Sequence, residues 1–190
     1  MSFLFSLCPA LCGFFLSPMI ALFTIASILA CKGGTNMYYI TLGLPTIIAT
    51  ICWSYEHATS SYAYIMRTLL NVVIPGFCMT LFIIHPIGGH AFYYALYWII
   101  PMVLFFVPSK NTVYGLFFTS LRISMIMHAI GSTMWLYAKT TTPLFWMKLI
   151  PVVAQERFKL ALASWVALIA LQKIASRLTK KNSKNLTCNA

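Results

Sequence analysis

Acidic residues are almost absent from this chain of 190 residues, since Glu56 and Glu156 are its two acids and it contains no aspartate. This excludes the DxxD type of magnesium chemistry on diphosphate lipids and aspartate-based proton relays. It also excludes EF-hand calcium loops and the Walker B aspartate of a nucleotidase. No GxxxxGK[ST] motif is present either, so the chain does not hydrolyse ATP by the P-loop route.

Charged residues of both signs are scarce. They make up 8% of the chain, whereas hydrophobic residues make up 61%. A soluble domain carries about 25% charged residues, so this composition has too few charges to cover a soluble globule. Disorder requires low hydrophobicity and high net charge, which excludes a disordered chain. The composition therefore excludes a soluble enzyme and indicates an integral membrane protein.

Metal-ligand patterns are also missing. None of the six cysteines forms a CxxC pair. Cys8 and Cys12 would share one helix face, where two thiols either bind a soft metal or act as small apolar side chains. His85 and His90 flank a turn but lack a third ligand. We expect no metal site and no cofactor.

The charge that is present is mainly basic. Thirteen lysines and arginines give a formal net charge of +11. A basic balance suggests nucleic acid in a soluble protein, but lysine and arginine also mark the cytoplasmic loops of membrane proteins. The only basic cluster is in the tail. We therefore interpret the charge as a signal of topology and expect no nucleic-acid partner.

Long apolar runs predict an all-α fold, a polytopic integral membrane helical bundle with about six transmembrane helices. A span needs about 20 mostly apolar residues, and helices are required because lipid offers no partners to open backbone groups. The turn at His85–His90, rich in glycine and proline, separates the third span from the fourth. The expected spans are residues 14–31, 38–54, 68–84, 91–107, 113–138 and 155–175.

Two segments between these spans look different. Residues 54–67 are expected to form a polar loop. The stretch near 142–155 is too short and too interrupted to cross a membrane, so we expect a short interfacial or re-entrant segment there. Trp146 and Lys148 would then lie at the headgroup level. Residues 1–176 together form a single membrane domain in this interpretation.

The basic residues set the expected orientation. Six spans put both termini on one side, and the basic tail at 177–190 assigns that side to the cytoplasm. Arg67 and Lys110 agree with this orientation, whereas Lys32, Lys139 and Lys148 oppose it. No basic residue precedes the first apolar run, which favours a retained anchor over a cleaved signal peptide. We expect a multi-pass protein of the cell (inner) membrane.

Ionisable side chains at membrane depth are costly, so each one is a functional candidate. Arg122 lies about ten residues into the fifth span. It either snorkels to the cytoplasmic surface or faces an anion or a glutamate within a cavity. Glu156 could neutralise Arg122 or Lys159, bind a cationic substrate group or lie at the outer interface. The sequence leaves these alternatives open.

His128 and Ser132 are four residues apart and share a helix face. They lie among small residues that let another helix approach, so this polar patch is either a packing face or the wall of a ligand site. A His–Ser pair also suggests hydrolysis, but a triad needs an orienting third group, and the chain has no GxSxG motif. We expect ligand contact or packing here rather than catalysis.

Aromatic residues gather just after the tight turn. Tyr94, Tyr97 and Trp98 share one face through their spacing of three and four residues. Such a group is typical of an interface belt. The alternative is a stacking wall for a flat heteroaromatic ligand, in a pocket that would also involve His128 and Trp135.

In span number and length the chain resembles the substrate-binding subunits of energy-coupling-factor vitamin transporters. Its segment Ala26-Ser-Ile-Leu-Ala30 matches the Ala-x-x-x-Ala patch with which that family docks its coupling partner. The resemblance implies a six-span protein with cytoplasmic termini that binds one vitamin or metal ion, while separate subunits hydrolyse ATP. The loop at 32–37 is shorter than the usual substrate lid. The metal-binding branch begins Met-His where this chain has Met1-Ser2, which disfavours nickel and cobalt.

We therefore expect a small-molecule, vitamin-like uptake component without its own ATPase. Its partners would be the lipid bilayer, the ligand and an ATPase-coupled membrane protein contacted through Ala26 and Ala30. Two alternatives stay open: a structural or assembly protein of membrane complexes, and an intramembrane enzyme that uses His128 with Ser132 or Glu156. The expected ligand-binding residues are His128, Ser132, Trp135, Tyr94, Trp98, Arg122 and Glu156.

Overall fold

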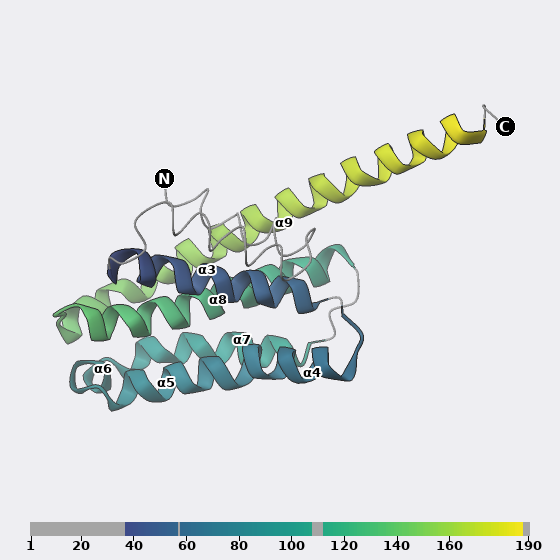
Figure 1. Cartoon of the computed structure of the whole chain (residues 1–190). Coiled ribbons are helices and arrows are strands. Elements are labelled where there is room, and N and C mark those ends of the chain that lie inside the picture. The colour runs from purple at the N-terminus through teal and green to yellow at the C-terminus, as the bar shows by residue number, and fades with distance from the viewer. Residues whose placement is uncertain (1–36, 57, 108–111, 188–190) are drawn as a thin grey trace.

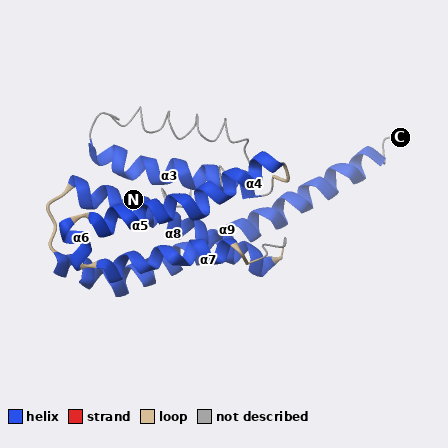
Figure 2. Cartoon of the chain, turned by 90° about the horizontal axis from the view of Figure 1, so that it is seen from below, coloured by secondary structure: helices blue, strands red, loops and turns tan. Residues whose placement is uncertain are grey.

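The computed structural model describes residues 37–56, 58–107 and 112–187, and these form helices without any strand (Figure 2). The predicted all-helical class is therefore confirmed for this part of the chain. The expected span at 14–31, with Ala26 and Ala30, lies outside the described residues. The elements are α3 (Met37–Glu56), α4 (Ser61–Thr68), η1 (Leu69–Val73), α5 (Ile74–Ile84), α6 (Pro86–His90), η2 (Phe92–Trp98), α7 (Ile99–Phe105), α8 (Val113–Ala138) and α9 (Pro143–Thr187).

Helix α8 is the centre of the bundle, and it packs against α3, α5, α7 and α9 (Figure 1). It begins where the backbone N–H of Gly115 donates to Thr112 Oγ1 at 3.1 Å, a side-chain cap of the helix N-terminus. It ends at Ala138, so the span predicted at 113–138 is confirmed as a helix with those bounds. The end of α3, the beginning of α4, the end of α7 and the beginning of α8 all lie at the same end of the bundle (Figure 1).

Residues 61–84 form one uninterrupted helical rod made of α4, η1 and α5. The expected polar loop at 54–67 is wrong, because α3 continues to Glu56 and Ser60 caps a new helix by accepting from the N–H of Ala63 at 3.1 Å. The π-helical turn η1 lies just before Pro75, whose ring has no N–H and would crowd the preceding turn of a regular α-helix. The wider turn lets the rod continue through the proline.

The predicted break at His85–His90 is a tight reversal in which Gly88 and Gly89 both pack closely against the end of α5. His85 ends α5 in an extended conformation, and its Nδ1 accepts from the N–H of Ile87 at 3.2 Å. Gly88 packs so closely that a Cβ atom there would lie 1.9 Å from the carbonyl oxygen of Phe82. A residue without a side chain is therefore required for the chain to turn back against α5.

Helix α9 is continuous over 143–187, so the expected interfacial or re-entrant segment at 142–155 is wrong. Pro151 lies inside this helix. Packing explains the continuity, because apolar side chains at seven- or eight-residue intervals are buried on both sides of the proline. These are Trp146, Val153, Leu160 and Leu168. Figure 1 shows α9 extending from the bundle beyond the other helices to the C-terminal end of the chain.

Apolar side chains cover the outside of the described bundle, and polar side chains lie within it. Exposed residues on the outside include Tyr64, Phe77, Ile84, Phe106 and Tyr114. Buried polar residues of α8 are Thr119, Ser120, Arg122, Ser124, His128, Ser132 and Thr133. Within the described residues, two helices, Ser61–Ile84 and Val113–Ala138, are long and apolar enough to cross a membrane, so the predicted bundle of six spans is not confirmed.

Candidate functional site

Three of the predicted site residues meet in one hydrogen-bond chain. Tyr94 Oη lies 3.1 Å from Ser132 Oγ, which in turn lies 3.2 Å from His128 Nδ1. All three side chains are buried. Tyr94 comes from η2, whereas His128 and Ser132 are one turn apart on α8, so the chain joins two elements. Each of these groups both donates and accepts hydrogen bonds, which lets the chain exchange its internal bonds for bonds to a ligand.

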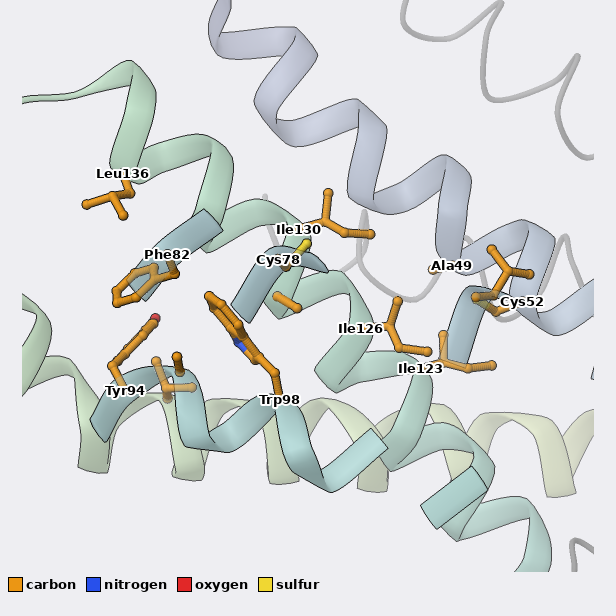
Figure 3. Close-up of a cluster of buried hydrophobic side chains, with 14 of the residues drawn as sticks. Ala49, Cys52, Cys78, Phe82, Tyr94, Trp98, Ile123, Ile126, Ile130 and Leu136 are labelled. Carbon is orange, nitrogen blue, oxygen red and sulfur yellow. The ribbon is translucent and has the colours of Figure 1, made fainter. Parts of the chain in front are cut away.

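Aromatic rings surround Tyr94, and Figure 3 shows Phe82 and Trp98 beside it. Phe82 stacks on Tyr94 with ring centroids 5.5 Å apart, and Trp146 meets Tyr94 edge-on at 4.9 Å. Trp98 meets Phe82 edge-on at 5.2 Å. Tyr94 and Trp98 are 1% and 0% exposed, so they point into the core. The burial of these two residues contradicts an interface belt, and a stacking wall for a ligand stays a prediction.

Two N–H donors near this chain are left without acceptors. In the described part of the protein, Trp98 Nε1 and Arg157 Nε are buried and meet no hydrogen-bond partner. Arg157 comes from α9, close enough to Tyr94 and His128 to interact with them electrostatically. Its backbone carbonyl accepts from Ser124 Oγ at 3.4 Å, which fixes α9 against α8. A buried donor without an acceptor is costly, and an ordered water or a ligand is a common explanation for one.

Two other predicted site residues lie away from the chain. Trp135 is 36% exposed, and Lys139 Nζ lies 5.9 Å above its ring. Glu156 is also exposed and pairs with Lys159 at 3.8 Å, which was one of its four expected alternatives. Neither side chain reaches the buried network.

Arg122 belongs to a second, ionic cluster that the sequence analysis did not anticipate. It forms a buried ion pair with Glu56, and both side chains are about 95% buried. Thr119 Oγ1 donates to the other carboxylate oxygen of Glu56 at 3.4 Å. The ring of Phe105 lies 6.0 Å from the guanidinium carbon of Arg122. The expected snorkelling of Arg122 is therefore wrong, and its expected pairing with a glutamate is right but involves Glu56 rather than Glu156.

Arg67 and Asn71 extend this ionic cluster along the 61–84 rod. Arg67 Nη1 donates to the backbone carbonyl of Glu56 at 3.4 Å. Asn71 Nδ2 donates to the backbone carbonyl of Arg67 at 2.6 Å. Asn71 sits in the π-helical turn, and such turns are frequent at functional sites. Sequence inspection missed Glu56 and Arg67 because both fell in the segment expected to be a loop. It missed Asn71, inside the expected span at 68–84, because that residue carries no charge.

Comparison of the chain with protein-family models, with curated proteins and with solved structures gives no match. A functional argument therefore has to start from the two polar clusters on α8 and from the surface of the bundle.

Proposed function

We propose that this protein is a multi-pass membrane protein that serves as the small-molecule binding component of an uptake system. The binding site is the chain of Tyr94, Ser132 and His128. The observation that carries the proposal is that two kinds of polar group occur together among aromatic rings. One is the hydrogen-bond chain of these three residues, and the other is the pair of unpaired N–H donors of Trp98 and Arg157. Ligand sites in proteins typically combine apolar walls with a few convergent polar groups.

The membrane placement rests on where apolar and polar groups lie. Large apolar side chains cover the outside of the described bundle, which is costly in water but favourable in lipid. The polar side chains of α8 lie inside, where intramembrane polar groups mark ligand pathways or helix contacts. Two of the described helices have the length and hydropathy of a span. The proposed orientation, with the basic tail in the cytoplasm, follows from the positive-inside rule.

The unmet donors also limit the chemistry of the ligand. Trp98 Nε1 and Arg157 Nε can only donate, so they favour a ligand that carries acceptor oxygens, such as a carboxylate. Phe82, Tyr94 and Trp146 supply ring faces and edges for a flat apolar portion. The aromatic side chains fill this region in the described state. Binding therefore requires the Tyr94–Ser132 bond to open and the rings to part.

Transport by this component requires an external energy source. The chain has no P-loop motif and only two acids, so it carries neither ATP hydrolysis nor the usual carboxylate proton relay. We therefore place an ATPase-coupled membrane protein beside it as the driving partner. The proposed contact is through Ala26 and Ala30, whose small side chains permit close helix packing.

Native mass spectrometry of the protein gently extracted from its own membrane tests this proposal. We expect a bound metabolite of defined mass or a co-purifying ATPase. Ser132→Ala should reduce the ligand-bound fraction because it removes the central group of the hydrogen-bond chain. Ser176→Ala is a matched control, since Ser176 is exposed on α9 and donates only to the nearby Lys173 carbonyl. A protein that carries neither ligand nor ATPase contradicts the proposal.

A structural or assembly role is the second candidate, and an outward-facing groove favours it. This groove of about 380 Å³ has an apolar lining and lies between α5 and α7. It is lined by Gly76, Met79, Ile99, Met102, Val103 and Phe106. Gly76→Leu would fill part of the groove. Loss of a large co-purifying complex in this variant, with metabolite binding unchanged, would favour the assembly role.

A further inference from the structure

The ionic cluster at the end of the bundle has more positive charge than negative charge. Glu56 supplies the carboxylate of the cluster, and Arg122 Nη2 donates to that carboxylate. Arg67 Nη1 donates only to the backbone carbonyl of Glu56, at 3.4 Å. The cluster therefore holds two guanidinium groups and one carboxylate, which leaves one positive charge in excess.

The cluster also has hydrogen-bonding capacity that the described residues leave unused. The Nε atoms of Arg67 and Arg122 and the Oδ1 atom of Asn71 are buried without partners there. Arg122 and Asn71 are 4% and 2% exposed, so bulk water does not compensate them. An unpaired group attached to a buried charge is especially costly. Such a combination of an excess positive charge, free N–H donors and a free carbonyl oxygen suits an anion that also carries a hydroxyl group.

The position of the cluster gives an anion access from one end of the bundle. Glu56 ends α3, and Arg67 lies one and a half turns after the start of α4, at the end of the bundle toward which α9 extends (Figure 1). Arg67 is half-buried and Arg122 is 4% exposed, so Arg67 is the more accessible of the two arginines. An incoming anion would meet Arg67 first and then compete with the Glu56 carboxylate for Arg122.

We infer that Arg67, Arg122 and Asn71 form a binding site for a phosphate-bearing anion, separate from the Tyr94–Ser132–His128 chain. Arginine suits this task because its planar guanidinium presents donors in pairs that match phosphate oxygens. Asn71 Oδ1 accepts from a hydroxyl of the same ligand. Glu56 holds Arg122 in place when the site is empty and yields it when the anion binds. The phosphate is either that of an anionic lipid headgroup or that of a free phosphate compound.

Two probes distinguish these sources. The first is a nanodisc of equal parts phosphatidylglycerol and phosphatidylcholine, from which retained lipids are counted by native mass spectrometry. The second is inorganic phosphate added to the detergent-solubilised protein, with its thermal midpoint as the readout. Selective retention of phosphatidylglycerol supports a lipid headgroup. A thermal shift with phosphate, absent with an equal concentration of chloride, supports a free phosphate ligand.

Variants test whether the bound anion lies at this cluster. Arg67→Gln should weaken the binding of whichever probe binds the wild type about tenfold, which corresponds to the loss of one charge-assisted hydrogen bond. Arg177→Gln removes the same charge from an exposed position of α9 and should leave binding unchanged. Glu56→Gln should strengthen binding, because it removes the carboxylate that competes for Arg122, whereas a purely structural role predicts no gain. The double variant Glu56→Gln with Arg122→Gln avoids an unpaired buried charge, and it should fold and lose binding.

The inference is overturned if neither probe binds the wild-type protein. It is also overturned if Arg177→Gln weakens binding as much as Arg67→Gln does, since the attraction would then come from net charge alone. A Glu56→Gln variant that folds and binds no more strongly than the wild type would equally contradict it.

Discussion

Helix α8 carries two polar clusters of opposite character. Its first half holds the ion pair of Arg122 with Glu56, where full charges are buried and a partner helix supplies the opposite sign. Its second half holds the neutral chain of Tyr94, Ser132 and His128, whose members both donate and accept. The two clusters lie on one helix but bond to different elements, the ion pair to α3 and the neutral chain to η2.

The comparison shows which cluster can change partners at little cost. Removing one member of a buried ion pair costs about 3–5 kcal/mol, because the remaining charge stays buried without compensation. A neutral hydrogen bond contributes only about 1 kcal/mol net. The Arg122–Glu56 pair therefore holds α3 against α8 and can exchange partners only for another anion, whereas the neutral chain can exchange its bonds without leaving a buried charge unpaired. This difference is the reason for placing the small-molecule site at the neutral chain.

Breaking the ionic cluster should have the largest effect on stability. Arg122→Leu leaves Glu56 buried and unpaired, and we expect a loss of about 3–5 kcal/mol in the free energy of unfolding. The measurement is denaturant unfolding of the protein in detergent, followed by tryptophan fluorescence. The double variant with Glu56→Gln should recover most of the loss. Equal stability of the single and double variants would show that the pair is not buried as described.

Overpacking the turn at Gly88, which contacts the Phe82 that stacks on Tyr94, should have the next largest effect on stability. In Gly88→Ala, the new Cβ would lie 1.9 Å from the Phe82 carbonyl oxygen and 3.1 Å from Leu136 Cδ2. We expect a loss of roughly 1–3 kcal/mol from this overpacking, measured in the same unfolding assay. Gly131→Ala is the control, since its Cβ would meet Pro45 Cγ at an ordinary 3.6 Å. Similar stability of the two variants would contradict the described turn.

Breaking the neutral chain itself should cost less stability and more binding. Ser132→Ala removes the bonds to Tyr94 and His128, and we expect a loss of about 1–2 kcal/mol in unfolding free energy. The ligand-bound fraction in native mass spectra should fall further than this stability loss explains. Tyr94→Phe should show a weaker version of both effects. A variant that loses stability but retains its full ligand occupancy would assign the chain to packing.

Breaking the exposed ion pair of Glu156 and Lys159 should have the smallest effect on stability. Glu156 and Lys159 are both more than half exposed and lie 3.8 Å apart. Solvent screens such a pair, so Glu156→Gln should change the unfolding free energy by about 0–1 kcal/mol. Its effect should be far smaller than that of Arg122→Leu in the same assay. A comparable loss would mean that burial does not determine how much these ion pairs contribute to the unfolding free energy.

Apolar runs in the sequence predicted much of the described fold. The long run at 113–138 gave α8 with its observed bounds, and the glycine-rich break at 85–90 gave the reversal after α5. Those signals are local, since hydropathy and turn chemistry act over a few residues. The break predicted around Pro151 is absent because the packing of α9 against other elements keeps the helix continuous there, and no local sequence pattern reports that packing.

The candidate sites were less predictable for the same reason. The four-residue spacing of His128 and Ser132 placed both on one face, but their link to Tyr94 crosses between elements. The partner of Arg122 was missed because the polar residues at 54–67 suggested a loop. In fact Glu56 lies in the last turn of α3, and Ser60 caps the next helix. Since the chain has only two acids, a buried arginine should have directed attention to both of them.

The central claim is that the neutral chain binds a ligand while the ion pair mainly holds the fold. Native mass spectrometry of three proteins, extracted identically from their own membrane, tests it most directly. These are the wild type, Ser132→Ala, and the double variant Glu56→Gln with Arg122→Gln. We predict a bound metabolite on the wild type and on the double variant, and its loss from Ser132→Ala. Equal ligand occupancy in all three proteins, or a wild type without any bound metabolite, would contradict the claim.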